Sequence, residues 1–492
     1  MTAQTILPAN SVTGGYDVAN SLRFNSGSSD TLSINMGTSS SRRIWTLSTW
    51  IKLSRDTNAD NMNIVGTGAS DDQNHIGFDG SGSVGNTKIA LRHHNGTSSD
   101  IHIQSNANYN DQSAWYHVVY SVDTTQGTDT NRVKIYVNGT QVTSLATSTY
   151  PSQNYDWDFF QNGSTTYIGR RGHSSAYLLD GYLAETVWID GTQLTPTSFG
   201  EFDEDSGIWK PISVSGLTFG DAGFYLETKQ SGTSQNSSGL GADTSGNDNH
   251  FAVANLTALD QSTDTCTNNF ATLNPLNSTL TNTVLSEGNL KLVGGRQSAQ
   301  YTYITGTIAV SSGKWYWEVK AVDNSEIDQV GVAKMDLAQF ATISTSTGLQ
   351  GAAYGGRGVQ MSNGNKVGDG SQGAHMGGFS ANNICMIALD LDNNKITFGR
   401  NGSWSNGSGG ADQTFANATA AYTDLTAGAM YVPAQTMRDS GNNNPGTMEY
   451  NFGNAPYAIS SGNSDGNGHG NFEYAVPSGY FALNTKNLAE HG

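Results

Sequence analysis

The sequence is short of charge, of cysteine and of long apolar runs, and each shortage excludes a class of protein. Only 13% of its 492 residues are charged, and no apolar spacing of i, i+3, i+4, i+7 persists, so amphipathic helices are not expected. The two cysteines, Cys266 and Cys385, lie in different regions, and neither a disulfide framework nor a metal-binding knuckle is expected. No apolar run approaches the roughly 20 residues of a membrane span, so no membrane insertion is predicted.

Basic residues are scarce as well. The chain has 24 Lys and Arg residues against 42 Asp and Glu residues, which gives a formal net charge of −18. An overall field of this sign repels a phosphate backbone, and nucleic acid is therefore not expected as a partner. The opening residues, MTAQTILPANS, lack the basic region and apolar core of a signal peptide, so synthesis and retention in the cytoplasm are predicted.

Glycine, by contrast, is abundant. It fills 59 of 492 positions, about 12% against a usual share of roughly 7%. Serine, threonine and asparagine are used where helical proteins carry lysine and glutamate. Frequent turns between short β-rich segments predict an all-β protein, and the length predicts about two to four domains.

The first half contains a series of alternating or β-rich segments that are closed by Gly, Asn or Ser. In chain order they read SLRFN, TLSIN, WTLSTWIKL, WYHVVYSVD, VKIYVNG, YIGR and DGYLAETVWIDG. This order resembles that of laminin-G-like, concanavalin-like jelly rolls. The resemblance implies an antiparallel β-sandwich over residues 20–250, a fold that hosts lectins, structural modules and glycosidases alike.

A second module follows a polar connection. Residues 251–285 are rich in Ser, Thr and Asn and contain Pro275, which predicts an interdomain linker. Beyond it, the segments LSEGNLKLV, GKWYWEVKA, QVGVAK, ALD and NFG occur in the order that is typical of a SPRY domain. This resemblance implies a second antiparallel β-sandwich over 286–485, in a family of binding and scaffolding modules. Residues 486–492 are interpreted as a C-terminal tail.

The first nineteen residues are predicted to act as a docking arm. They carry no ionisable side chain before Asp17, and they contain Pro8 and the pair Gly14-Gly15 ahead of the first strand signal. A polar, uncharged, extended segment can add its backbone hydrogen bonds to a neighbour's sheet edge. A frayed terminus is the alternative interpretation.

Three acids at alternate positions, Glu201, Asp203 and Asp205, raise the question of glycoside hydrolysis. One face of a strand would bring them into a single cleft, where a protonated and an ionised carboxyl could share the work. Their surroundings, residues 195–211, contain Gly and Pro and lack a period-2 apolar face. The segment is therefore interpreted as a solvated acidic loop, no catalytic residue is predicted, and a cation held by Asp203 and Asp205 stays open.

A second acidic motif imitates a calcium loop. Asp390, Asp392 and Asn394 match the opening of an EF-hand, but Lys395 stands in place of the required glycine. A hairpin turn explains the segment better. No metal and no cofactor are predicted.

Binding is the expected chemistry, because sugars are gripped by aromatic faces and planar hydrogen-bonding side chains on loops. The segments LRHHNG, YDWDFFQNG and GRRGHSSAY, with two Gly-rich insertions of the second module, offer such side chains. The predicted ligand-binding residues are Arg92, His93, Trp157, Arg171, His173, Tyr177, Tyr354, Arg357 and Trp404. The alternative for each is structural: the aromatic rings cap a sandwich edge or anchor a loop, and the arginines balance nearby acids.

The combination of an acidic, Gly-, Ser- and Asn-rich chain with these two sandwiches resembles the fibre or decoration proteins of marine bacteriophages. The resemblance implies a place on the virion surface, with head fibre, decoration protein and tail fibre all open, and release by lysis. It implies other virion structural proteins and a host-surface glycan as partners, and closed symmetry favours a homo-oligomer. A glycan-binding adhesin is therefore expected, with a purely structural decoration and a glycan-cleaving depolymerase as the alternatives.

Overall fold

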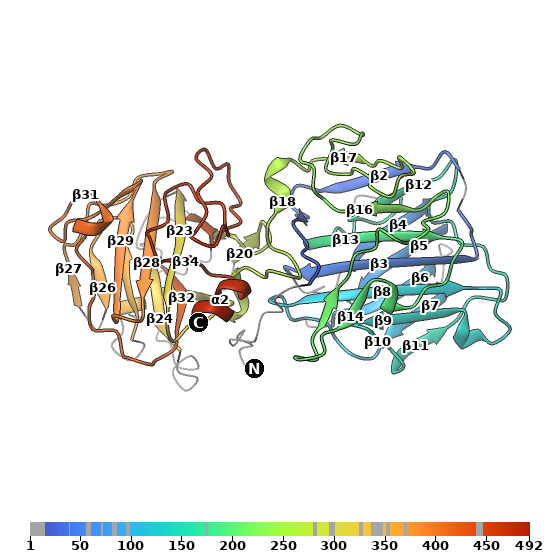
Figure 1. Ribbon diagram of the computed structural model, residues 1–492, viewed down its shortest axis with the longest axis horizontal. Coiled ribbons are helices and arrows are strands. Elements are labelled where there is room, and N and C mark those ends of the chain that lie inside the picture. Colours follow the sequence, from blue (N-terminus) through green and yellow to red (C-terminus); the bar gives the residue numbers. More distant parts are fainter. Residues whose placement is uncertain are drawn as a thin grey trace. The chain divides into compact units, whose positions relative to one another are not determined.

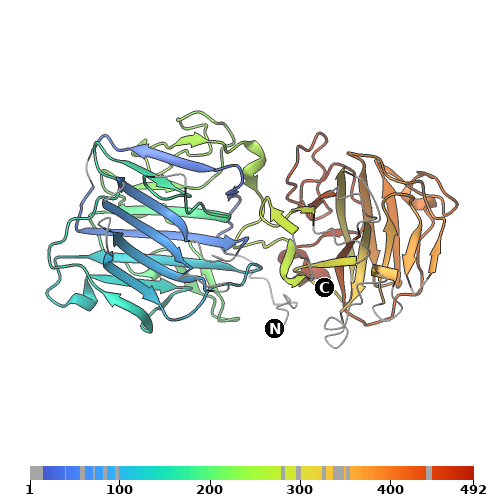
Figure 2. The same ribbon diagram turned by 180° about the vertical axis from the view of Figure 1, so that it is seen from behind.

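The protein consists of two β-sandwich units (Figures 1 and 2). The computed structural model describes residues 15–38, 40–55, 61–69, 72–80, 86–94, 99–173, 176–278, 283–294, 301–323, 328–335, 348–350, 355–368, 371–438 and 446–492. The first unit ends at Thr267 and the second begins at Asn268. The expectation of an all-β chain with two antiparallel sandwiches is confirmed. No described helix is long and apolar enough to cross a membrane.

The first unit packs two eight-stranded sheets face to face. Sheet 1 has the order β10 (Thr140–Gln141), β9 (Val133–Val137), β8 (Trp115–Asp123), β3 (Ile44–Leu53), β13 (Gly181–Asp190), β1 (Ser21–Phe24), β18 (Gln261–Ser262), with β16 (Phe224–Leu226) paired to β13. Sheet 2 has the order β11 (Leu145–Thr149), β7 (Ser99–Ser105), β6 (Lys88–His94), β5 (Asp72–Asp79), β4 (Met62–Ala69), β12 (Thr165–Ile168), β2 (Thr31–Asn35), β17 (Ala252–Ala254). Outside them lie the hairpin β14 (Gly200–Phe202) and β15 (Trp209–Pro211) and the 3₁₀ turns η1 (Asp129–Asn131), η2 (Pro196–Ser198) and η3 (Ala258–Asp260).

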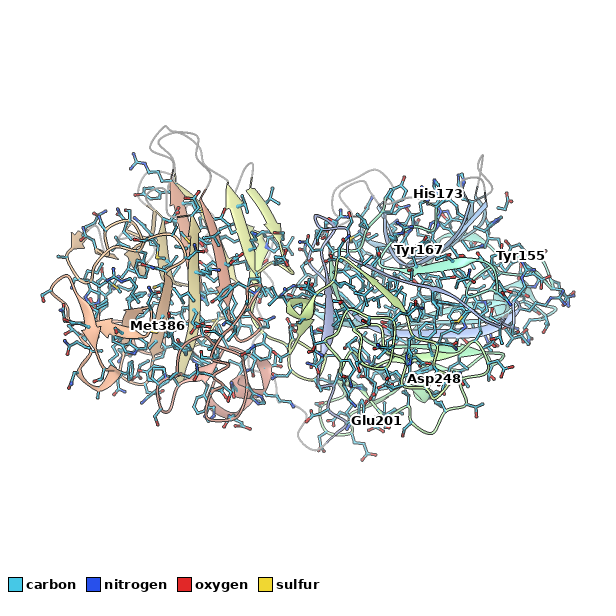
Figure 3. The ribbon with its side chains drawn as sticks, turned by 90° about the horizontal axis from the view of Figure 1, so that it is seen from above. Tyr155, Tyr167, His173, Glu201, Asp248 and Met386 are labelled. Carbon is cyan, nitrogen blue, oxygen red and sulfur yellow. The ribbon has the colours of Figure 1, made fainter. Side chains whose placement is uncertain are left out.

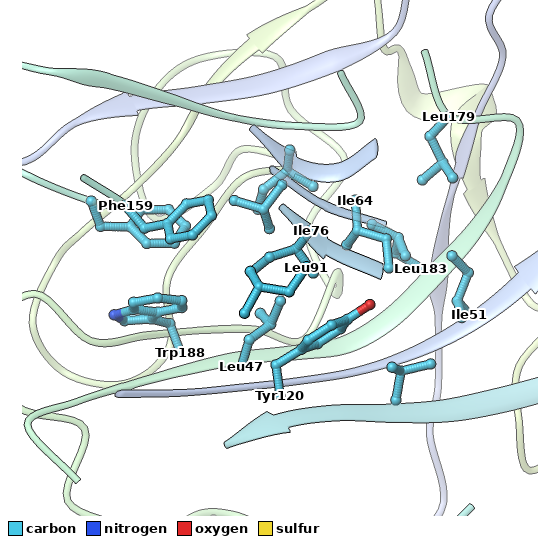
Figure 4. Packing of buried hydrophobic residues seen from close by; sticks show 14 of the residues in the cluster. Leu47, Ile51, Ile64, Ile76, Leu91, Tyr120, Phe159, Leu179, Leu183 and Trp188 are labelled. Atoms are coloured by element: carbon cyan, nitrogen blue, oxygen red, sulfur yellow. The ribbon is translucent and has the colours of Figure 1, made fainter. Parts of the chain in front are cut away.

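The core of the first unit follows from the two-residue period of its strands. Leu47 and Tyr120 of sheet 1 face Ile76 and Leu91 of sheet 2 across the interior (Figure 4), and all four side chains are buried. Burying one large apolar side chain contributes about 1.5–3 kcal/mol. The apolar residues at alternate positions therefore fix which face of each strand points inward, and the polar residues between them are left for the outside.

The second unit is built in the same way from a seven-stranded and a nine-stranded sheet. Sheet 3 has the order β19 (Leu273–Ser278), β22 (Tyr301–Gly306), β32 (Tyr431–Arg438), β24 (Gln329–Lys334), β25 (Arg357–Gln360), β26 (Lys366–Gly368), β27 (Ser371–Gly373). Sheet 4 has the order β20 (Thr283–Ser286), β21 (Lys291–Gly294), β33 (Thr447–Asn451), β23 (Lys314–Asp323), β28 (Ile384–Asp390), β29 (Lys395–Arg400), β30 (Ser403–Ser405), β31 (Ala411–Gln413), with β34 (Phe481–Ala482) parallel to β23. The remaining elements are η4 (Gly348–Gln350), η6 (Phe415–Asn417) and the helix α2 (Thr485–His491).

The SPRY-like motifs form strands of this unit. The segment GKWYWEVKA supplies β23, QVGVAK supplies β24 and ALD ends β28. Asp390 and Lys395 are paired across a hairpin whose turn residue Asn394 has a φ of 53°. The backbone N–H of Asn393 donates to the Asp390 carboxylate at 3.0 Å. The interpretation of the EF-hand-like segment as a hairpin turn is confirmed.

The boundary between the two units, at Thr267 and Asn268, falls inside the predicted linker, residues 251–285, but the segment is built into the sheets of both units. Its first part belongs to the first unit, where β17 pairs with β2 and β18 pairs with β1, and its last part forms β19 and β20 of the second unit. Asp264 is fully buried and accepts a hydrogen bond from Lys52 Nζ at 2.8 Å and another from Trp115 Nε1 at 3.0 Å. Buried polar side chains such as that of Asp264 are built into the fold, and composition alone does not distinguish them from the polar side chains of a linker.

Parts of both chain ends pack on the two units. Of the predicted docking arm, residues 1–14 lie outside the described residues. Tyr16 and Val18 pack on the first unit: the Tyr16 hydroxyl donates to Glu185 at 3.1 Å, and the Val18 N–H donates to Thr267 Oγ1 at 3.1 Å. The predicted tail, 486–492, is largely the helix α2, which buries Leu488 in the second unit.

Candidate functional site

Strand β5 presents three polar side chains to the outside of sheet 2. Ile76 and Phe78 point into the core, so His75 and Asp79 belong to the opposite, outer face of the sheet. Gln73 precedes them on the same face, and Gly77 lies between them. The inward face of the strand carries the two apolar side chains together with the buried Asn74.

The neighbouring strands continue this polar row. In the antiparallel register, Arg92 of β6 lies directly opposite His75, and His102 of β7 lies directly opposite Arg92. Arg92 Nη1 donates to Asp79 Oδ2 at 3.0 Å, and His102 Nε2 lies 3.1 Å from the same oxygen. We call His75, Asp79, Arg92 and His102 the outer-face cluster. The carboxylate binds Arg92 by a hydrogen bond and lies beside His102, and partial burial makes the Arg92–Asp79 contact stronger than that of an exposed ion pair.

His75 is the most unusual member of the outer-face cluster. Its side chain is 6% exposed, and neither ring nitrogen has a hydrogen-bond partner among the described residues. Burial, with the positive charges of Arg92 and Arg171, lowers the pKa of His75 to about 3, so the ring is neutral at pH 7. A buried polar atom without a partner costs about 1–3 kcal/mol, so the outer-face cluster holds this ring at a cost in stability.

A loop lies against the outer face beside this cluster. A Cβ built on Gly66 of β4 would lie 2.5 Å from the carbonyl oxygen of Arg170 and 2.8 Å from the nitrogen of Gly172. Glycine is therefore needed at position 66 for the main chain of 170–172 to approach so closely. The loop closes on itself, because the Leu179 N–H donates to the Gly169 carbonyl at 2.8 Å.

The loop delivers two arginines to the outer face. Arg171 Nε donates to Gln73 Oε1 of β5, and the Arg171 guanidinium lies 4.7 Å from the ring centroid of Tyr177. The Arg170 guanidinium lies 3.7 Å from the ring centroid of Tyr167 of β12. Stacking on an aromatic ring fixes a guanidinium at low entropic cost.

These contacts unite part of the predicted set. Arg92, Arg171 and Tyr177 come together on the outer face, and His173 is exposed on the same loop (Figure 3 labels His173 and Tyr167). We call the outer-face cluster together with Gln73, Arg171 and Tyr177 the outer-face site. Sequence reasoning missed His75, Asp79, His102 and Gln73; the signal was the two-residue alternation in residues 72–79 and 101–103.

The other predicted residues lie elsewhere. His93 points inward and is buried, with its ring 5.8 Å from that of Tyr155. Trp157 is 0% exposed and stacks on Phe159 in the core at 5.8 Å, so it offers no surface to a ligand. An aromatic ring in a polar loop had suggested a surface role, but its large apolar area is worth more when buried.

In the second unit, the predicted residues are also structural or outside the described part. Trp404 is buried against Phe415, with ring centroids 4.7 Å apart. Arg357 is buried in β25 and pairs with Asp424 at 3.3 Å. Tyr354 lies outside the described residues.

The acidic segment is a largely exposed hairpin: Glu201 lies on a short strand, and Asp203 and Asp205 lie in the turn, as the loop interpretation predicts. Glu201 lies on β14, which pairs with β15. Hydrogen bonds from the backbone and hydroxyl of Ser206, together with Lys210, lower the pKa of Asp203 to about 2. The Glu201 carboxylate is exposed and lies 3.4 Å from Lys210 Nζ. Retaining hydrolysis needs one protonated carboxyl beside an ionised one, whereas the lowered pKa of Asp203 favours its ionised form. Within the described residues, no group of three His, Cys, Asp or Glu side chains could hold a metal ion.

A second buried acid lies apart from the outer-face site, in sheet 1. Glu185 has a φ of 50° at a bulge between Ala184 and Val187, where β13 shifts register against β3. It accepts hydrogen bonds from the hydroxyls of Tyr225 and Tyr16. Burial raises the pKa of Glu185 to about 7. This carboxyl ties Tyr16 to the sandwich, and its protonation changes near neutral pH.

Comparison with known proteins agrees with the fold. Residues 26–197 match a laminin G family model of the concanavalin A-like lectin/glucanases superfamily. The SPRY domain of human HERC1 is similar at 19% identity and a TM-score of 0.28, over 36% of this chain and 96% of that one. A heptameric SAP-like pentraxin from Limulus polyphemus is similar at 18% identity and a TM-score of 0.26, over 37% of this chain and 80% of that one. The PSpry domain of TRIM65 gives 16% identity and a TM-score of 0.26, over 37% and 91%.

No curated protein matches the chain. The chain thus combines a first β-sandwich that matches the concanavalin A-like family model with a second antiparallel β-sandwich.

Proposed function

We propose that this protein binds glycans through the outer-face site of its first unit and acts as a surface protein of a bacteriophage virion. The observation that carries the binding proposal is the row His75, Arg92 and His102, with Arg171 and Tyr177 beside it. A rigid sheet presents these side chains, and sugars are recognised by planar hydrogen-bonding groups next to aromatic rings. The concanavalin-like match of residues 26–197 supports this chemistry, because that superfamily is described as containing lectins.

Binding without turnover is the chemistry that we propose. Asp79 is the carboxylate of the outer-face cluster, and it is engaged by Arg92 and His102. A glycosidase needs two carboxyl groups about 5–10 Å apart across the scissile bond. The outer-face cluster contains one carboxylate, Asp79, and in the β14–β15 hairpin both Glu201 and Asp203 are paired with Lys210. This arrangement favours a lectin over a depolymerase.

The place on a virion rests on the resemblance of the two-module chain to phage fibre and decoration proteins. It carries with it other virion structural proteins as partners, a host-surface glycan as ligand, a homo-oligomeric state and no role for nucleic acid or membrane insertion. Peptide mass spectrometry of purified phage particles tests it: peptides of this chain in intact virions would support the placement, and their absence would contradict it.

One observation favours a purely structural decoration as the second candidate. The hairpin β14–β15 exposes two large apolar side chains, Phe202 at 53% and Ile208 at 43%. Paired exposed apolar groups of this kind are typical of a protein contact. In that case the chain would attach to its neighbours and bind no sugar.

A glycan array separates the two candidates. The full chain is screened beside two variants, Arg171→Ala and Lys134→Ala. Lys134 lies on β9 of sheet 1, so its removal changes the net charge equally without touching the outer-face site. Glycan binding that is lost in Arg171→Ala and kept in Lys134→Ala supports the lectin. No binding, or binding that Arg171→Ala leaves intact, contradicts it.

A further inference from the structure

We infer that the outer-face site takes an anionic group of a sugar, the carboxylate of an acidic sugar or a sulfate ester, which Arg171 and Arg92 bind beside His75. This inference deepens the proposed glycan binding and rests on it. It concerns which class of sugar the site selects.

Positive charge gathers on the outer face of sheet 2. The chain is acidic overall, with a net charge of −18, yet Arg92, Arg170 and Arg171 converge on one face of one sheet. Among the described residues, Asp79 and Asp100 are carboxylates on this face. Asp79 is bound to Arg92, and Asp100 lies near the start of β7. Fields of distant charges are screened within about 8 Å at physiological salt, so the cationic surroundings decide what binds here.

The geometry of Arg171 supplies the second argument. Its Nε is occupied by Gln73, and its planar group stacks beside Tyr177. Among the described residues, the two terminal nitrogens make no hydrogen bond. Those two N–H groups form a fork that matches the paired oxygens of a carboxylate or sulfate. Because the stacking already fixes the guanidinium, little further entropy is lost on binding.

His75 supplies the third argument. Both of its ring nitrogens lack partners in the described structure, and the ring is held neutral between positive charges. The ring nitrogens are buried, so the ring contributes through the local field and not through direct contact with a ligand. An anion bound by Arg171 and Arg92 beside this ring would offset the repulsion among the positive charges, and a neutral sugar hydroxyl would not.

The overall negative charge also limits the size of the ligand. A dense polyanion would be repelled by the acidic remainder of the surface, whereas a short oligosaccharide with one or two acidic groups meets mainly the local field. The ligand class is therefore a short acidic oligosaccharide, and its anionic group is either a carboxylate or a sulfate.

Calorimetric titration of the full chain tests this with matched pairs of probes. One pair is an oligouronate and its carboxyl-reduced form, and the other is a sulfated galactan oligosaccharide and its desulfated form. We expect at least one anionic member to bind about tenfold or more tightly than its neutral counterpart, as charge-assisted hydrogen bonds imply. The pair that shows the difference identifies the anionic group.

Variants locate the effect. Arg171→Gln, on a loop, should abolish the preference and leave the melting temperature nearly unchanged, while Lys134→Gln should keep both the affinity and the preference. Arg92→Gln should act like Arg171→Gln if it folds. In the bound wild-type protein, the pKa of His75 should rise from about 3, which NMR of the imidazole measures.

Two results overturn the inference, and they differ in what they imply. Equal affinity for both members of each pair, with loss of both in Arg171→Gln, contradicts the anionic preference and leaves glycan binding at this site standing. Absence of binding to every probe, acidic and neutral, contradicts the proposed function itself.

Discussion

Replacing Gly66 by alanine tests whether the arginine loop is seated as described. The new Cβ would lie 2.5 Å from the Arg170 carbonyl oxygen, whereas ordinary contacts begin at 3.4 Å. The loop must therefore retreat by about 0.9 Å, the difference between these distances. A misplacement of about 1 Å at a binding group can cost up to about a hundredfold in its function. We expect glycan affinity to fall at least tenfold, because Arg171 moves away from the cluster.

Gly66→Ala should also lower the free energy of unfolding. Overpacking in a rigid core costs about 1–3 kcal/mol, but here the obstacle is a surface loop, so the cost should lie at the lower end of that range. Calorimetric titration and thermal unfolding of the full chain measure the two effects. Gly216→Ala is the control, since a Cβ there meets nothing within 4 Å. Unchanged affinity in Gly66→Ala would refute the account of how the loop positions Arg171.

Three further predictions concern the buried and exposed acids. The pKa of Glu185 is about 7 against an ordinary 4.5, so the folded state binds this proton more tightly than the unfolded state. The protonated carboxyl therefore adds about 3 kcal/mol to the free energy of unfolding below pH 4.5, and this contribution is lost as the pH rises through 7. Glu185→Gln should flatten this decline in urea unfolding between pH 5 and pH 8, and an unaltered slope would count against it. Asp264→Asn leaves the buried Lys52 ammonium without its charge partner and should cost about 3–5 kcal/mol, whereas a change under 1 kcal/mol would show that the pair is not buried. The double variant of Glu201→Gln and Asp203→Asn should leave glycan affinity unchanged and produce no loss of turnover; any hydrolysis that it abolishes would restore the depolymerase.

The strands of the fold were predictable wherever the two-residue period was strong. The segments WTLSTWIKL and WYHVVYSVD form β3 and β8, and GKWYWEVKA forms β23. In each segment, every second residue supplies an apolar side chain to the same face of the strand. The segment 251–285 failed for the opposite reason. Its apolar residues, such as Phe251 and Leu273, are buried in the cores but do not alternate along the segment, and its ladder pairing and the Lys52–Asp264 ion pair leave no local signal.

The candidate site was predictable only in part. Arg171 and Tyr177 were found because charged and aromatic side chains in a Gly-rich loop are visible in the sequence, and Arg92 was found as a charged residue ahead of a turn although it lies on β6. His75 and Asp79 were missed because their role depends on the register of β5 against β6, a contact between residues more than ten positions apart. Trp157 was assigned to the surface because composition does not show which way a loop side chain turns.

Hydrogen exchange of the full chain, measured with and without the oligosaccharide that it binds best, shows whether the glycan binds at the outer-face site. Binding at the outer-face site predicts slower exchange in β5, in β6 and in the loop 169–179, because the ligand orders the backbone that carries His75, Arg92 and Arg171. The second unit should be unaffected. Protection confined to the second unit, or to the hairpin β14–β15, would contradict the claim.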